Sequence, residues 1–372
     1  MRLGGLKLGG HLDRYVGSLF LMSYVTALLV VVGLFFILDM ASNLDDFLEP
    51  WADGSSTPSV YLARYYVLNL PFLFMQSAPF VTLTGAMFTV SRLMKHNEIS
   101  AALSAGVSTH RVMLPIFMGS VLVAVGMFGF REIATSQMAR QRDALHYVLK
   151  ERSYDRVYEN LWLRDENGAR IRLGEFRPAT GTPPRAEILD LEVTYARGDV
   201  LTSVEASRAT YVQRAEGLAW ALEDGLRFDV GEDQEQTNPE FLEYTEFSPE
   251  LAMTFFRARN QPLDLSFTEV RDLSARDPDN VLYQTLLQYH LTFPLANIVL
   301  LLVGLPLMLR QDRGRGVERL GFGLLLCVFF FGADFIFRNL GMQGALQPLM
   351  AAWIPVLFFG SLGIVLVDSM KT

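Results

Sequence analysis

The run Ser18 to Leu38, SLFLMSYVTALLVVVGLFFIL, decides the class of fold because it contains 21 residues without a charge. About 20 apolar residues in a helix span the hydrocarbon core of a bilayer, which is roughly 30 Å thick. The run is longer than the roughly 7 to 15 apolar residues of a signal peptide, and no A-x-A cleavage pattern follows it. We therefore expect a retained membrane-spanning helix.

Five further apolar runs are long enough to cross a bilayer. They are Tyr65 to Ser91, Val112 to Phe130, Val281 to Leu309, Leu320 to Phe337 and Leu346 to Val367. The sequence thus predicts an α+β membrane protein with six transmembrane helices in a 3+3 arrangement around an inserted domain. We place the first three spans in residues 1–131, the insert in 132–280 and the last three spans in 281–372.

The insert differs from the rest of the chain in charge. Residues Glu132 to Tyr283 contain 29 acidic and 18 basic residues, whereas the remainder contains 11 acidic and 14 basic residues. Cys327 is the only cysteine and lies in an apolar run, which excludes an intrachain disulfide and a Cys-based metal site. A soluble acidic domain therefore interrupts the membrane protein.

Basic residues are concentrated in alternate connections between the spans. Three connecting regions carry most of them: Arg2, Lys7 and Arg14; Arg92, Lys95 and Arg111; and Arg310, Arg313, Arg315 and Arg319. The first and fifth connections contain only Arg64 and Arg338. Because short cytoplasmic loops are enriched in Lys and Arg, we expect both termini in the cytoplasm and the insert outside.

Alternating apolar residues in the insert predict β-strands. Leu161 and Leu163 precede Asn167-Gly168, and Ile171 and Leu173 follow it, which is typical of a hairpin with a type I′ turn. Further short strands follow every 8 to 12 residues or so, and this spacing favours a sandwich or jelly roll. His146 is the only histidine of the insert, so neither a His-rich metal site nor a hydrolase triad is expected.

The second connection, Lys95 to Arg111, reads KHNEISAALSAGVSTHR and predicts a short helix. Asn97 is a favourable N-cap residue and Gly106 a favourable residue after the C-cap, so the helix would run from Glu98 to Ala105. Ile99 and Leu103 share one face, with Ala102 beside them. Two interpretations follow: docking into a groove of a partner protein, or an amphipathic helix resting on lipid headgroups. The small residues provide too little apolar bulk for a helix that rests on lipid headgroups.

The chain lacks an ATP-binding motif of its own. None of its four lysines, Lys7, Lys95, Lys150 and Lys371, follows the glycines of a phosphate-binding loop. Asp334 is the clearest ionisable residue within a span, and Arg338 lies four residues later. The pair is either an ion pair near a helix end or part of a polar cavity or gate. Any energy for transport would then come from a cytoplasmic partner.

Several stretches together resemble the lipopolysaccharide export permeases LptF and LptG. They are Leu12 to Gly17 (LDRYVG), Leu38 to Leu48 (LDMASNLDDFL), Lys95 to Arg111, Phe293 to Leu307 (FPLANIVLLLVGLPL) and Ala351 to Pro355 (AAWIP). They occur in the same order over nearly the whole chain, and the insert lies where that family carries a periplasmic jelly roll. The LDRY start favours the LptG side.

The resemblance implies a non-catalytic subunit of an ABC transporter in the bacterial inner membrane. Its implied partners are an LptB-like ATPase dimer that binds ATP and Mg²⁺, a second LptF-like or LptG-like permease, a single-span LptC-like protein, an LptA-like periplasmic bridge and lipopolysaccharide. No nucleic acid, metal site or catalytic residue is implied. On this analogy, the residues that couple to the ATPase are Arg92, Glu98, Ile99, Ala102 and Leu103. Residues at the lipid cavity or gate are Phe35, Asp39, Phe331, Asp334 and Arg338.

One departure from the family concerns charge near the outer end of the first span. Some LptG proteins carry lysines there, whereas this chain has Asp39, Asp45, Asp46 and Glu49. Arginines elsewhere, divalent ions, cations of the partner permease or a different lipid would each account for this. Two other functions are compatible with the sequence: a membrane-anchored scaffold whose β domain binds envelope partners without transport, and, with less support, a membrane hydrolase.

Overall fold

A computed structural model describes residues 10–48, 59–151, 157–180, 185–197, 200–214, 217–230, 236–244, 247–310 and 316–370. The chain divides into two compact units. A helical unit comprises Met1–Asp45, Tyr66–Ala134 and Gln284–Thr372, and a β unit comprises Asp46–Tyr65 and Thr135–Tyr283.

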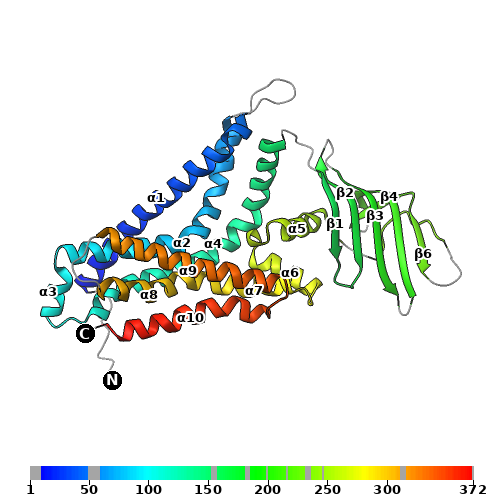
Figure 1. Cartoon of the computed structure of the whole chain (residues 1–372). Coiled ribbons are helices and arrows are strands. Elements are labelled where there is room, and N and C mark those ends of the chain that lie inside the picture. The colour runs from blue at the N-terminus through cyan, green and yellow to red at the C-terminus, as the bar shows by residue number, and fades with distance from the viewer. Residues whose placement is uncertain are drawn as a thin grey trace. The chain divides into compact units, whose positions relative to one another are not determined.

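Six helical segments are long and apolar enough to cross a membrane, which confirms the six predicted spans. They belong to α1 (His11–Leu48), α2 (Ser59–Lys95), α4 (Thr109–Glu151), α7 and α8 (Val281–Thr292 and Ala296–Arg310), α9 (Gly316–Met342) and α10 (Pro348–Asp368). The short helix α3 (Glu98–Ser104) connects α2 to α4. Figure 1 shows α3 at the same end of the helical unit as the start of α1 and the end of α10.

The fourth span is broken where proline removes a backbone donor. A 3-10 turn, Phe293–Leu295, separates α7 from α8 and contains Pro294. Asn297 Nδ2 donates to the Pro294 carbonyl over 2.9 Å, and the hydroxyl of Thr82 on α2 donates to Asn297 Oδ1 over 2.7 Å. Thr82 and Asn297 are both fully buried. Neighbouring side chains thus satisfy the polar groups at the break, as an apolar environment requires.

Helix α1 packs most closely against its neighbours along its first half, which holds all of its described buried residues, from Val16 to Ala27. A Cβ at Gly85 of α2 would lie 2.9 Å from the Cα of Tyr24, and one at Gly119 of α4 would lie 2.5 Å from Cε1 of Phe20. By contrast, none of residues 30–43 is buried, and Leu34 and Ile37 are 55% and 64% exposed, although the Phe36 ring contacts Tyr66 of α2. The first half of α1 is therefore fixed to α2 and α4, whereas this chain leaves the second half largely uncovered.

The β unit contains one antiparallel sheet in the order β1-β2-β3-β4-β5, with β6 also paired to β4 (Figure 1). The strands are β1 (Tyr158–Arg164), β2 (Arg170–Thr180), β3 (Arg185–Arg197), β4 (Val200–Arg214), β5 (Gly217–Glu223) and β6 (Leu226–Val230). β5 and β6 pair with β4 in one continuous register, so they form a single edge strand interrupted at Asp224-Gly225. The described strands therefore form a meander, and the predicted two-sheet jelly roll is not confirmed.

A column of five residues crosses every strand of this sheet. From β1 to the last strand it contains Asn160, Gly174, Asp190, Ser207 and Asp224, which lie between consecutive paired positions. Asn160, Asp190 and Asp224 have positive φ angles of 51°, 56° and 54°. Asn and Asp tolerate this left-handed conformation better than other non-glycine residues. The column thus marks a shared distortion of all strands.

At the column, the alternation of buried and exposed side chains along each strand shifts by one residue. On β2 the buried residues Leu173 and Phe176 are three positions apart instead of two, and on β3 the same holds for Ile188 and Leu191. The residues after β6 cover both halves of the sheet, because Tyr244 stacks on Tyr195 and Phe247 stacks on Trp220. The distortion thus allows one covering segment to bury apolar residues on both sides of the column.

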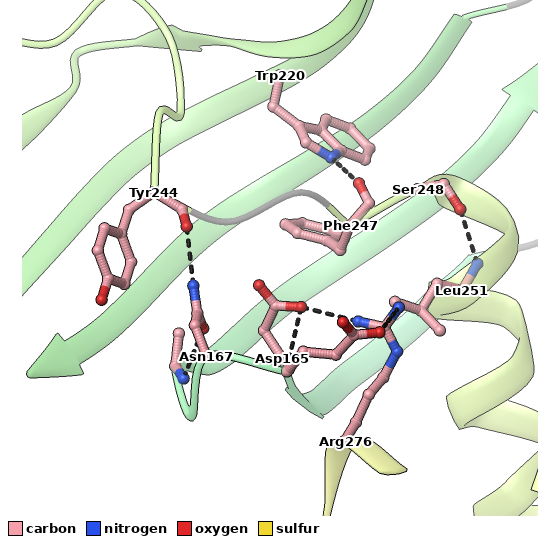
Figure 2. A network of polar contacts seen from close by, with 10 residues as sticks. Asp165, Asn167, Trp220, Tyr244, Phe247, Ser248, Leu251 and Arg276 are labelled. Atoms are coloured by element: carbon pink, nitrogen blue, oxygen red, sulfur yellow. Dashed lines mark hydrogen bonds and ion pairs between the residues drawn. The ribbon is translucent and has the colours of Figure 1, made fainter. Parts of the chain in front are cut away.

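The predicted β1–β2 hairpin is confirmed, but its predicted turn type is wrong. Gly168 has φ +83°, whereas Asn167 is not among the residues with positive φ, and a type I′ turn requires both. Gly168 N donates to the Asp165 carbonyl, and Asp165 N donates to the Ala169 carbonyl, each over 2.9 Å. This is a type I turn followed by a bulge. The Asn167 side chain instead bridges Ala169 N and the Tyr244 carbonyl (Figure 2).

Two helices after the sheet were not predicted. α5 (Pro249–Asn260) begins with Ser248 as N-cap and proline at the first position, and α6 (Phe267–Arg276) begins with a capping box formed by Ser266 and Glu269. Both signals are visible in the sequence. Ion pairs connect this segment to the hairpin: Arg164 to Asp277 at 2.6 Å and Arg276 to Asp165 at 2.8 Å (Figure 2 shows the second).

The part of α4 that belongs to the β unit contains a buried ion cluster. Arg142 contacts Asp264 at 2.6 Å and Asp143 at 2.8 Å. Burial lowers the pKa of Arg142, but the charges and hydrogen bonds of these two carboxylates raise it more, so its pKa lies above the usual value. The cluster connects α4 to the short turn Pro262–Asp264 between α5 and α6.

Candidate functional site

Helix α3 is the first candidate site, and its ends are set by two residues in the left-handed conformation. Asn97 occupies the predicted N-cap position with φ 56° but makes no side-chain capping bond. Gly106 has φ +80° and occupies the predicted position after the C-cap. Its N–H donates to the Leu103 carbonyl, and Val107 N–H donates to the Ala102 carbonyl. This pair of bonds is a Schellman motif, which favours glycine at that position.

The two faces of α3 have different roles. Ile99 is only 7% exposed and packs in the core of the helical unit, and Ala102 and Val107 pack against the same core. Leu103, by contrast, is 40% exposed. The remaining small residues Ser100, Ala101, Ser104 and Ala105 are exposed as well. Ile99 therefore holds the helix against its own chain, and the accessible surface consists of Leu103 and the small residues.

Side chains of α1 and a backbone carbonyl of α10 hold the two ends of the α3 segment. The hydroxyl of Tyr15 donates to Glu98 Oε1 over 3.0 Å at the first residue of α3. Beyond its last residue, Arg111 makes a bidentate contact with Asp13, at 2.5 and 2.7 Å. His110 Nε2 lies 3.1 Å from the Val367 carbonyl of α10. Arg92 lies exposed in the last turn of α2.

A second cluster contains the predicted gate residues of α9. Arg338 Nη1 donates to Asp334 Oδ2 over 3.1 Å, and the Arg338 guanidinium lies 4.6 Å from the ring centroid of Tyr289 on α7. Arg131 of α4 lies over the same ring at 5.9 Å. Asp334 and Arg131 are 8% and 9% exposed. The structure thus brings the buried Arg131 and the partly buried Arg338 to one tyrosine and one carboxylate, and the sequence reasoning missed Arg131 and Tyr289.

The other predicted gate residues are distributed over two helices. Phe331 packs edge-on against Phe330 of the helical core, whereas Phe35 is 43% exposed on α1. Asp39 accepts a hydrogen bond from Asn43, one turn later on the same helix. In the part of the chain that the structure describes, no hydrogen bond, ion pair or ring contact is found that joins Phe35 or Asp39 to the α9 cluster.

The β unit contains a hollow of about 280 Å³ beside the sheet. It is lined by Tyr195, Val204, Arg227, Pro239, Phe241, Leu242, Glu243 and Tyr244. Six of these eight side chains are apolar or aromatic, and Arg227 and Glu243 are charged.

Comparison with protein families decides the class of protein to which these features belong. The sequence model described as "Lipopolysaccharide export system permease LptF/LptG" matches residues 14–368, nearly the whole chain. The chain belongs to the LptF/LptG family. No curated protein matched it. Membership implies a role in lipopolysaccharide export as a permease, which is a non-catalytic transporter subunit, but does not separate LptF from LptG.

The family places this LptF/LptG permease among inner-membrane proteins, in agreement with its six membrane-spanning segments. Within the described residues, we find no group of three or more His, Cys, Asp or Glu side chains that would hold a metal ion. The helical unit offers two candidate sites: the small-residue face of α3, and the two arginines Arg131 and Arg338 around Tyr289.

Proposed function

We propose that this LptF/LptG permease extracts lipopolysaccharide from the inner membrane and passes it to an LptA-like periplasmic bridge. A dimer of LptB-like ATPases supplies the energy, a second permease of the family completes the transport unit, and an LptC-like protein binds beside it. Both termini and α3 face the cytoplasm, and the β unit faces the periplasm. The observation that carries the proposal is the exposed face of α3, on a helix that the chain itself holds in place.

The geometry of α3 suits a groove on a partner. Small residues let two backbones approach closely, and Leu103 provides one apolar side chain for a pocket. Resting on lipid headgroups is the less favourable alternative, because Ile99, the other large apolar residue of α3, is already buried in the chain's own core. ATP-driven movement of the ATPase would thus push on α3 directly.

The arginines around Tyr289 offer a site for lipid phosphates. Arg131 and Arg338 place two guanidinium groups beside the Tyr289 ring, and guanidinium groups suit the phosphates of a lipid. Because the first connection is acidic, this proposal assigns the contact with lipid phosphates to arginines elsewhere in the chain. Asp45, Asp46 and Glu49 themselves lie outside the described side chains.

The test enlarges the small-residue face of α3. Ala101 is exposed, so Ala101→Trp should leave the fold intact but prevent docking, whereas Ala101→Ser should behave as the wild type. The readouts are co-purification of the LptB-like ATPase and ATP-dependent release of lipopolysaccharide from vesicles that contain the assembled complex. Normal docking of Ala101→Trp would refute the assigned surface. Partner binding without any ATP-dependent release in the wild type would favour the membrane-anchored scaffold instead.

A further inference from the structure

The orientation of α3 depends on contacts outside the helix. α3 has only seven residues, and isolated helices shorter than about 12–15 residues are marginal in water. Asn97 adds no side-chain cap. Ile99 packs in the core of the helical unit, and Ala102 and Val107 pack against the same core, which fixes how deeply the helix lies. Polar contacts at the two ends add to these apolar contacts in setting the direction in which α3 points.

Two of the end contacts join one side chain to another. In each of them, one of the two side chains belongs to the first two turns of α1. Tyr15 binds Glu98 at the start of α3, and Asp13 binds Arg111 at the start of α4. The Asp13 carboxylate also accepts a hydrogen bond from Gly10 N over 3.1 Å, at the beginning of α1. One carboxylate thus caps α1 and binds the residues that follow α3. Bidentate pairs of this kind fix relative orientation as well as distance.

Helix α1 has the form of a lever from this point onward. Its first half is fixed to α2 and α4 at Tyr24 and Phe20, where glycines allow close approach. Its second half exposes Leu34 and other large apolar residues. A rotation imposed on its first turn would therefore displace its far end, while the packed region acts as the pivot.

We propose that Asp13 and Tyr15 are positioning residues that transmit movement of α3 to the first span. This inference rests on the proposed function, because it requires a partner that pushes on α3. The two side chains contact neither ATP nor lipid in this scheme. They determine whether a push on α3 tilts α1 or is absorbed locally by the short connection between α3 and α4.

The experiment compares Tyr15→Phe combined with Asp13→Asn against Thr26→Val, in the assembled complex in vesicles. Thr26 also lies on α1, but its hydroxyl binds the Met22 carbonyl of the same helix, so its removal breaks no contact between helices. The first readout is lipopolysaccharide released per ATP hydrolysed. The second is the change, on trapping with an ATP analogue, in the distance between spin labels at Leu34→Cys and Leu122→Cys. The labels are placed in a Cys327→Ala background.

We expect the Tyr15 and Asp13 variant to bind the ATPase normally, to release roughly two- to tenfold less lipid per ATP and to lose most of the distance change. Thr26→Val should match the wild type. Exchange of the charged pair, Asp13→Arg with Arg111→Asp, should recover part of the coupling. Unchanged coupling and distances in the variant would overturn the inference, as would loss of ATPase binding. Failure of the wild type itself to bind an ATPase would instead overturn the proposed function.

Discussion

Thr82 on α2 donates a hydrogen bond of 2.7 Å to Asn297 on α8, and both side chains are fully buried at the break in the fourth span. Asn297 in turn donates to the Pro294 carbonyl, whose position in a 3-10 turn interrupts the helix. One hydrogen bond between helices therefore supports the geometry of a broken span.

Thr82→Val should lower the free energy of unfolding in detergent by about 1–2 kcal/mol, because the buried side-chain amide of Asn297 would lose one of its hydrogen-bond partners. The combined change Thr82→Val with Asn297→Leu should cost less than the sum of the two single changes. Thermal unfolding followed by circular dichroism measures both, and Thr26→Val is the control. Strict additivity would show that the hydrogen bond does not couple the two helices.

Reversal of the charge at Glu98 should weaken the docking surface on α3. Glu98→Lys reverses the charge at the first residue of α3 and places a cation at the N-terminal end of a helix, where the dipole favours an anion. We expect ATPase retained on affinity-purified permease to fall by about tenfold, which corresponds to roughly 1.4 kcal/mol. Glu250→Lys is the matched control, because its side chain is 74% exposed in the β unit. Equal retention in the two variants would contradict the prediction.

A methyl group at Gly174 should disturb the column that crosses the sheet. Its Cβ would lie 2.7 Å from the Cβ of Asp190 and 3.0 Å from the Leu189 carbonyl oxygen. Because a backbone atom cannot move aside cheaply, Gly174→Ala should destabilise the β unit by about 1–3 kcal/mol. Hydrogen exchange of residues 170–180 reports this loss. Gly126→Ala, where nothing lies within 4 Å, should leave exchange of the same segment unchanged.

Arg276 should contribute to the stability of the β unit, whereas Arg271 should not. Arg276→Met leaves Asp165 buried without this cation, at a cost of about 2–4 kcal/mol. Arg271 pairs with Asp272 on the surface, and both side chains are more than half exposed, so Arg271→Met should change stability by less than about 0.5 kcal/mol. Limited proteolysis of the full-length protein in detergent measures the difference. Similar digestion rates for the two variants would refute the assigned role of the buried pair.

The spans were predictable because apolar length alone defines them, and α3 was predictable because Gly106 marks its end. The burial of Ile99 was not, since Ile99 and Leu103 share one face by their spacing and only packing determines that Ile99 is buried and Leu103 exposed. The pairing of Asp334 with Arg338 follows from their spacing, whereas Arg131 comes from a span more than 200 positions earlier in the sequence. Local patterns give no information on contacts of this kind.

Strand prediction succeeded on each side of the column but not across it. Alternation places Leu161, Leu163, Ile171 and Leu173 correctly, and all four are buried. Beyond Gly174 the same rule would turn Phe176 to solvent, yet Phe176 is fully buried. The physical cause is the left-handed backbone at Asn160 and Asp190, which an Asn or Asp residue permits but does not require.

The shared phase change limits how the length of this sheet can vary during evolution. Deletion of one residue from a single strand near the column would move the side chains of half of that strand to the opposite face of the sheet, out of phase with the neighbouring strands. Compensation would need matching deletions in every strand, from β1 to β6. Family members should therefore differ in length at the turns and keep constant the number of residues between each turn and the column.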